Sequence, residues 1–99
     1  MRVRTVGILS TGDMGHSVGR VLREGGFDVV TCLTGRSKRT RQLAGEAEIR
    51  DIPEMDDLVR EVDLILAILV PDQAIPLARQ VAASIKRTGT QPAYADCNA

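Results

Sequence analysis

Residues 3–15, with the sequence VRTVGILSTGDMG, constrain the fold more than any other part of the chain. Apolar, strand-forming residues come first, small flexible residues follow, and a helical pattern begins directly afterwards. This order indicates a strand, a glycine turn and a helix. Such a turn brings the backbone close to a pyrophosphate, and the helix N-terminus points its free N–H groups at the anion. The stretch therefore predicts a dinucleotide site.

The glycine turn matches the dinucleotide motif G-x-G-x-x-G at two of its three glycines. The residues in the best register are Ser10, Thr11, Gly12, Asp13, Met14 and Gly15. Ser10 replaces the first glycine, and a serine with negative φ fits a tight turn and can offer its hydroxyl to a phosphate. We expect these residues to contact the pyrophosphate. An ordinary βα turn, whose glycines only let the helix pack closely, is the alternative.

A basic segment, residues 34–41 (TGRSKRTR), follows the second expected strand and carries four cations and no acid. NAD-selective folds place an Asp or Glu here, about 20 residues past the glycines, on the ribose 2′-hydroxyl. A carboxylate repels a 2′-phosphate, whereas a guanidinium binds it through two hydrogen bonds. The segment thus favours NADP over NAD, although basic helix starts are often merely solvated. The expected contacts are Arg36, Ser37, Lys38 and Arg39.

Strands and helices alternate along the whole chain. Strands are expected near residues 3–9, 27–33, 48–50, 63–70 and 93–97, with helices near 13–24, 39–46, 53–61 and 73–87. This alternation predicts an α/β fold of Rossmann-like, three-layer type, with a parallel sheet in the order 3-2-1-4-5 and helices on both faces. Val21 and Ile75 are among the apolar helix positions expected to face the sheet.

The composition limits the possible partners. Ninety-nine residues form one domain or part of one, and 13 basic side chains balance 13 acidic ones. Zero net charge and 2% aromatic residues argue against nucleic acid and membrane surfaces as partners. We interpret the acids of residues 54–61 as a solvated helix face, Cys32 and Cys97 as buried thiols, and the setting as cytoplasmic.

Four short motifs follow the first, second, fourth and fifth expected strands: Gly12-Asp13-Met14-Gly15, Gly35-Arg36-Ser37, Leu69-Val70-Pro71 and Asp96-Cys97-Asn98-Ala99. In this order and spacing they resemble the NAD(P)-binding domain of the β-hydroxyacid dehydrogenase superfamily, which includes 6-phosphogluconate and 3-hydroxyisobutyrate dehydrogenases. The similarity is to a 6-phosphogluconate-dehydrogenase-like branch, and it covers nearly the whole chain.

The resemblance implies an oxidoreductase that transfers a hydride between a nicotinamide cofactor and a small hydroxy acid. It places Val70 and Pro71 beside the nicotinamide, and Asn98 where the family has a substrate-holding serine. The family's catalytic lysine belongs to a helical substrate and dimerisation domain, so we expect residues 1–99 to be the N-terminal NADP-binding part, with no catalytic residue and little activity alone. A homo-oligomer is possible. The alternatives are a non-catalytic, dinucleotide-binding regulatory module, and a pyrroline-5-carboxylate or F420-type reductase.

Overall fold

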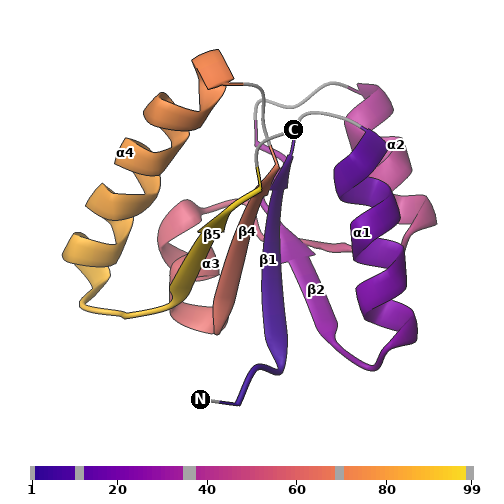
Figure 1. The fold of residues 1–99 in the computed structure, drawn as a ribbon, viewed down its shortest axis with the longest axis horizontal. Coiled ribbons are helices and arrows are strands. Elements are labelled where there is room, and N and C mark those ends of the chain that lie inside the picture. The colour runs from indigo at the N-terminus through magenta and orange to yellow at the C-terminus, as the bar shows by residue number, and fades with distance from the viewer. Residues whose placement is uncertain (1, 11–12, 35–37, 69–70, 98–99) are drawn as a thin grey trace.

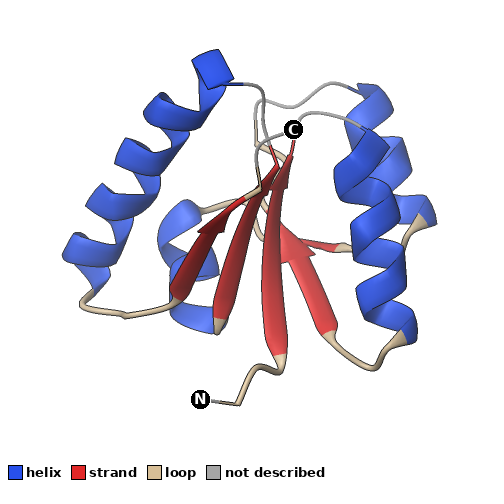
Figure 2. Cartoon of the chain, in the orientation of Figure 1, coloured by secondary structure: helices blue, strands red, loops and turns tan. Residues whose placement is uncertain are grey.

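The computed structural model describes residues 2–10, 13–34, 38–68 and 71–97, and residues 10, 13, 14 and 71–73 by their backbone only. It has five parallel strands in the order β3-β2-β1-β4-β5, with helices on both faces (Figures 1 and 2). The elements are β1 (Thr5–Ser10), α1 (Asp13–Glu24), β2 (Asp28–Thr31), α2 (Lys38–Glu46), β3 (Arg50–Asp51), α3 (Met55–Glu61), β4 (Leu64–Ile68), α4 (Pro71–Thr88) and β5 (Ala93–Asp96). The predicted fold class and strand order are confirmed.

Two apolar cores cover the two faces of the sheet. On the face of α1 and α2, Ile8, Val29 and Ala44 belong to one buried cluster. On the face of α3 and α4, Leu58 and Ile65 belong to the other. Two covered faces explain why β4 has no polar alternation, as expected for a central parallel strand.

The helix faces differ from the sequence pattern most clearly at two large apolar residues. Val21 is 66% exposed and Ile75 is 63% exposed, although both were expected to face the sheet. In α4 the buried positions are instead Ala74, Leu77, Val81 and Ser84. The prediction was wrong because hydrophobicity alone favoured Ile75, whereas the helical spacing from Leu77 and Val81 selects Ala74 and Ser84.

The edges of the elements also shift by a few residues. Strand β2 ends at Thr31, two residues before the expected end, and α4 begins at Pro71, two residues earlier than expected. Proline is well placed in the first turn of a helix because that turn leaves its N–H groups unpaired. Among the helices that the structure describes, none is long and apolar enough to cross a membrane.

Candidate functional site

The expected site lies at the carboxyl edge of the sheet. Strands β1 and β4 pair in parallel up to Ser10 and Ile68, and helices α1 and α4 begin directly after them (Figure 1). Strand β1 pairs with β4 on one side and with β2 on the other. The strand order therefore reverses direction between β1 and β4. Open α/β sheets bind their ligands at such a reversal, outside the carboxyl ends of the strands.

The predicted contact residues divide into three groups. Thr11, Gly12, Arg36, Ser37, Val70 and Asn98 lie outside the described residues. Ser10, Asp13, Met14 and Pro71 are placed by their backbone at the end of β1 and the starts of α1 and α4. Gly15, Lys38 and Arg39 are fully described: Gly15 is buried in α1, and the two cations are exposed in the first turn of α2.

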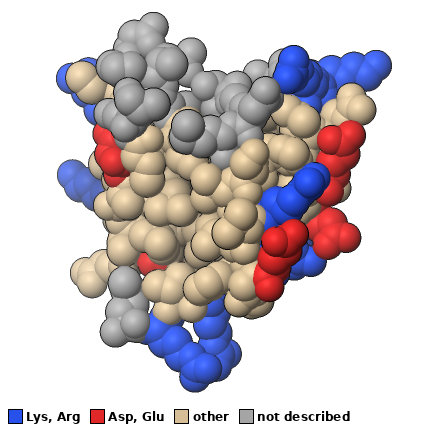
Figure 3. Space-filling model, turned by 45° about the vertical axis from the view of Figure 1, so that its right-hand side comes forward, with Lys and Arg blue, Asp and Glu red and all other residues tan. Residues whose placement is uncertain are grey.

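The described part of the site therefore joins a helix N-terminus with a basic surface. Helix α1 begins at the central carboxyl edge and presents the positive end of its dipole there. Figure 3 shows basic side chains at the upper right of the molecule, the end at which α2 begins. Helix α2 has no acidic residue in its first turn. This arrangement suits an anionic ligand.

A small pocket of about 30 Å³ lies between α1, α2 and the first two strands. Its lining residues are Ile8, Gly15, His16, Thr31, Leu33, Thr40, Leu43, Ala44 and Ile49. It has room for about one water molecule, so it is not large enough to hold a nucleotide base. His16 is half-buried and lines this pocket. Its Nε2 atom lies 3.4 Å from Nη2 of Arg20.

Charged side chains hold the backbone where β2 ends. The Leu33 N–H donates to Oδ1 of Asp51 at 2.9 Å, and the Leu33 carbonyl accepts from Nη2 of Arg41 at 2.9 Å. The Thr34 hydroxyl donates to the carbonyl of Pro53 at 2.7 Å. The sequence pattern did not identify these roles: Arg41 was only one cation of the basic segment, and Asp51 was not among the predicted site residues.

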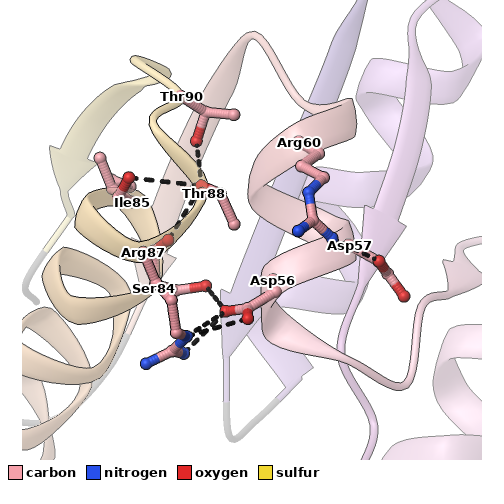
Figure 4. Close-up of polar contacts among 8 residues, drawn as sticks. All are labelled: Asp56, Asp57, Arg60, Ser84, Ile85, Arg87, Thr88 and Thr90. Atoms are coloured by element: carbon pink, nitrogen blue, oxygen red, sulfur yellow. Dashed lines mark hydrogen bonds and ion pairs between the residues drawn. The ribbon is translucent and has the colours of Figure 1, made fainter.

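The acids of α3 are paired rather than simply solvated. Asp56 accepts hydrogen bonds from the Arg87 guanidinium and from the Ser84 hydroxyl of α4 (Figure 4). The Arg87 hydrogen bonds, followed by that of Ser84, hold the pKa of Asp56 well below its usual range. Asp57 pairs with Arg60 at 3.0 Å. Within the described residues no three His, Cys, Asp or Glu side chains form a metal-binding group.

The prediction of buried thiols was wrong. Cys97 is exposed and Cys32 is half-buried, and both are free. Both residues directly follow the last residue of a strand, Thr31 of β2 and Asp96 of β5. The Cys32 thiol donates to the carbonyl of Pro53 over 3.3 Å.

Solved structures share this fold. One is a conserved protein of unknown function whose structure is similar to 3-hydroxyacid dehydrogenases; it aligns with a TM-score of 0.81 and 24% identity over 95% of this chain and 34% of its own. A Bacteroides fragilis protein assigned as an NADP oxidoreductase aligns with a TM-score of 0.68 and 14% identity over 97% and 35%. An imine reductase variant from Myxococcus stipitatus, in complex with NAD+, gives 0.56 and 16% over 99% and 41%.

A sequence relative adds little about function. It is an uncharacterised 28.5 kDa protein of Methanothermus fervidus, encoded in the 7S RNA 5′ region, and it is 22% identical over 82% of this chain and 32% of its own length. The chain thus spans about a third of the length of this relative and of the first two structures.

The family assignment comes from a match over residues 1–93 to the sequence model of the acetohydroxy acid isomeroreductase NADPH-binding domain. This match covers nearly the whole chain, and it supports a nicotinamide dinucleotide as the cofactor, as the glycine turn predicted. Together with the fold it shows an NADPH-binding domain of the Rossmann-like class. The chain belongs to the acetohydroxy acid isomeroreductase NADPH-binding domain family.

Proposed function

We propose that this chain is the cofactor-binding part of an NADP-dependent oxidoreductase that transfers a hydride between the nicotinamide and a small hydroxy acid. The observation that carries the proposal is the place of α1: its N-terminus meets the carboxyl edge of the sheet where the strand order reverses. The family match over residues 1–93 supports the same reading.

The proposed pyrophosphate contacts come from the turn between β1 and α1. They are Ser10, Thr11, Gly12, Asp13, Met14 and Gly15. The described geometry fits this role, because α1 lies close enough to the sheet that both Gly15 and Gly19 are buried. Backbone N–H groups in the first turn of α1 have no partner within the helix and are available to an anion.

The proposed contacts to the adenosine end are Arg36, Ser37, Lys38 and Arg39. Lys38 and Arg39 begin α2 and are exposed, and no acid lies in that first turn to repel a 2′-phosphate. A basic first turn opposes the helix dipole, and a bound anionic ligand would offset this unfavourable placement of positive charge. We therefore assign NADP as the preferred cofactor, with NAD weaker.

The nicotinamide end is assigned to Val70 and Pro71, and Asn98 is assigned to the substrate side. The bound cofactor supplies the hydride chemistry. We place proton transfer and most substrate contacts in a helical domain that corresponds to the remaining two thirds of the relatives' length. Such a domain would also form the dimer, in a cytoplasmic enzyme similar to the 6-phosphogluconate-dehydrogenase branch.

A hydroxy acid is the proposed substrate class because two independent matches concern that chemistry. The family is named for an acetohydroxy acid enzyme, and one structural neighbour resembles 3-hydroxyacid dehydrogenases. A reductase of the pyrroline-5-carboxylate or F420 type is the second candidate. The similar fold of an imine reductase is compatible with it.

A nuclear magnetic resonance titration with NADPH tests the location of the site. We expect shifts of the backbone signals of Gly15, Lys38 and Arg39, with little change at Asp63 and Gly89, which lie at the opposite edge of the sheet. Shifts confined to Asp63 and Gly89, or no shifts at millimolar NADPH, would contradict the proposed site.

A further inference from the structure

The main-chain N–H and carbonyl of Leu33 are both hydrogen-bonded to charged side chains. The backbone pairing of β2 with β3 ends with Thr31 and Asp51, and Ile52 N–H donates to the Thr31 carbonyl at 2.7 Å. Beyond this point Asp51 accepts the Leu33 N–H and Arg41 donates to the Leu33 carbonyl, each over 2.9 Å. Two side chains of opposite charge thus hold the main chain of Leu33, two residues beyond the end of β2.

The neighbours of Leu33 are fixed by a second anchor. The Pro53 carbonyl, between β3 and α3, accepts from the Thr34 hydroxyl at 2.7 Å and from the Cys32 thiol at 3.3 Å. Leu33 itself is only 8% exposed. Residues 32–34 are therefore held by β3, by the β3–α3 connection and by α2.

This segment lies where a Rossmann-like fold meets the adenosine ribose, at the end of its second strand. Arg41 is the fourth residue of α2, so its bond to Leu33 also ties the first turn of that helix to β2. That turn carries Lys38 and Arg39. The Arg41 bond therefore links the segment after β2 to the helical turn that carries these two cations.

We propose that Arg41 and Asp51 are positioning residues that strengthen NADPH binding by holding Leu33 and Thr34 in place beside the cations of α2. The proposal rests on the proposed function. It assigns Arg41 a role different from the one that the basic segment suggests, because its guanidinium supports the main chain. It also means that an acidic residue, Asp51, strengthens the binding of the negatively charged cofactor NADPH.

Asp51 provides the sharper test, because its two possible roles predict opposite changes in NADPH affinity when its charge is removed. If its charge merely acted on the 2′-phosphate, removing that charge would strengthen NADPH binding. If Asp51 positions Leu33, Asp51→Ala weakens NADPH binding by about tenfold, since a hydrogen bond to a charged group is lost. Asp51→Asn keeps an acceptor oxygen and should stay within about threefold of the wild type.

The experiment is calorimetric titration of the 99-residue chain and its variants with NADPH, with Asp57→Ala as the control that removes an exposed acid from α3. Arg41→Met should also weaken binding about tenfold, and the double variant Arg41→Met/Asp51→Ala should be little weaker than either single variant, because both bonds hold one residue. An Asp51→Ala chain that binds NADPH as tightly as the wild type, or additive losses in the double variant, would overturn the proposal.

Amide hydrogen exchange of Leu33 in the free chain gives a readout that needs no cofactor. Asp51→Ala should speed the exchange of the Leu33 amide more than that of amides in the strands, whereas Asp57→Ala should not; fast exchange of the Leu33 amide in the wild type would overturn the proposal. If Asp51→Ala does not fold, Arg41→Met decides: a positioning role leaves the salt dependence of NADPH binding unchanged, and a direct phosphate contact makes it shallower. Wild-type chain that binds no NADPH contradicts the proposed function itself, whereas binding that is indifferent to Asp51 contradicts only this inference.

Discussion

Gly19 shows how much a single position decides about the packing of this fold. A Cβ built on Gly19 would overlap Cδ1 of Ile49 and lie 3.4 Å from Cδ1 of Ile8. The absence of a side chain therefore lets α1 approach the sheet. Gly15 and Gly19 are four residues apart, a spacing that places both on one helix face and indicates a close approach. The spacing cannot identify Ile49, which is distant in the chain.

We expect Gly19→Ala to destabilise the chain. Overpacking a buried site costs about 1–3 kcal/mol, and the better helix propensity of alanine offsets about 1 kcal/mol of this. Gly45→Ala in α2 is the control, because nothing lies within 4 Å of the added Cβ, and it should be neutral or stabilising. Urea unfolding measures both, and adding Ile49→Val to Gly19→Ala should restore part of the loss. Equal stability of Gly19→Ala and the wild type would contradict this packing.

Single-residue chemistry was the least predictable part of the site. The basic segment and the glycine turn could be found because their residue types are unusual for their positions. Asp51 and Arg41 could not, since an acid in a short edge strand and one more arginine are ordinary features. Their roles depend on which main-chain groups remain unpaired once the sheet has formed, and only the folded chain shows this.

At the scale of the elements, α3 and α4 are joined by a polar cluster that no sequence period marks. Ser84 is completely buried in α4 and its hydroxyl donates to Asp56 of α3, while Arg87 donates to the same carboxylate at 2.7 Å (Figure 4). The elements themselves were predictable from apolar spacing, and their ends shifted by only a few residues. The pairing across α3 and α4 was not, because it joins residues 28 and 31 positions apart.

Two carboxylates with lowered pKa values, Asp56 in this cluster and Asp63 before β4, make the stability of the fold depend on pH. Hydrogen bonds from Arg87 and Ser84 lower the pKa of Asp56, and the N–H groups of Arg4 and Thr5 lower that of Asp63. A carboxyl group whose pKa is lower in the folded than in the unfolded state stabilises the fold at pH values above its unfolded pKa, which is about 3.9. This stabilisation is lost as the pH falls towards the folded-state pKa.

We therefore expect the thermal midpoint to fall between pH 6 and pH 3, and Arg87→Met to make this fall smaller. Lys86→Met, which removes a neighbouring exposed cation of α4, is the control and should keep the wild-type dependence. Circular dichroism melts at several pH values measure the effect. Parallel curves for Arg87→Met and Lys86→Met would contradict a special role of the Asp56 pair.

At the scale of the whole molecule, the alternation of strands and helices was enough to predict the sheet order 3-2-1-4-5, because right-handed crossovers allow few arrangements. The class of cofactor, a nicotinamide dinucleotide, followed from the glycine turn in that context. The family did not: the four motifs resembled the β-hydroxyacid dehydrogenase superfamily, whereas the family model that matches is that of the acetohydroxy acid isomeroreductase NADPH-binding domain. The substrate could not be predicted in the same way, because the chain spans about a third of the length of its relatives and substrate contacts are proposed to lie mostly in the rest.

The 99-residue chain should transfer no hydride from a hydroxy acid to NADP+ at a measurable rate. We place the proton-transfer group, and the residues that exclude water from the site, in the helical domain proposed above, so residues 1–99 alone should lack both. Absorbance at 340 nm with a panel of small hydroxy acids checks this. Turnover by the purified chain, abolished by Lys38→Ala and unaffected by Lys86→Ala, would contradict the division of roles.

Calorimetric titration with NADPH and with NADH tests the central claim most directly. The wild-type chain should bind NADPH more tightly than NADH, and Arg36→Ala or Lys38→Ala should weaken NADPH binding by about tenfold or more while changing NADH binding little, since each removes a charge-assisted contact to the 2′-phosphate. Lys86→Ala, a cation at the opposite edge, should change neither. Equal affinity for both cofactors, unaffected by Arg36→Ala and Lys38→Ala, would contradict the NADP assignment, and no binding of either would contradict the site.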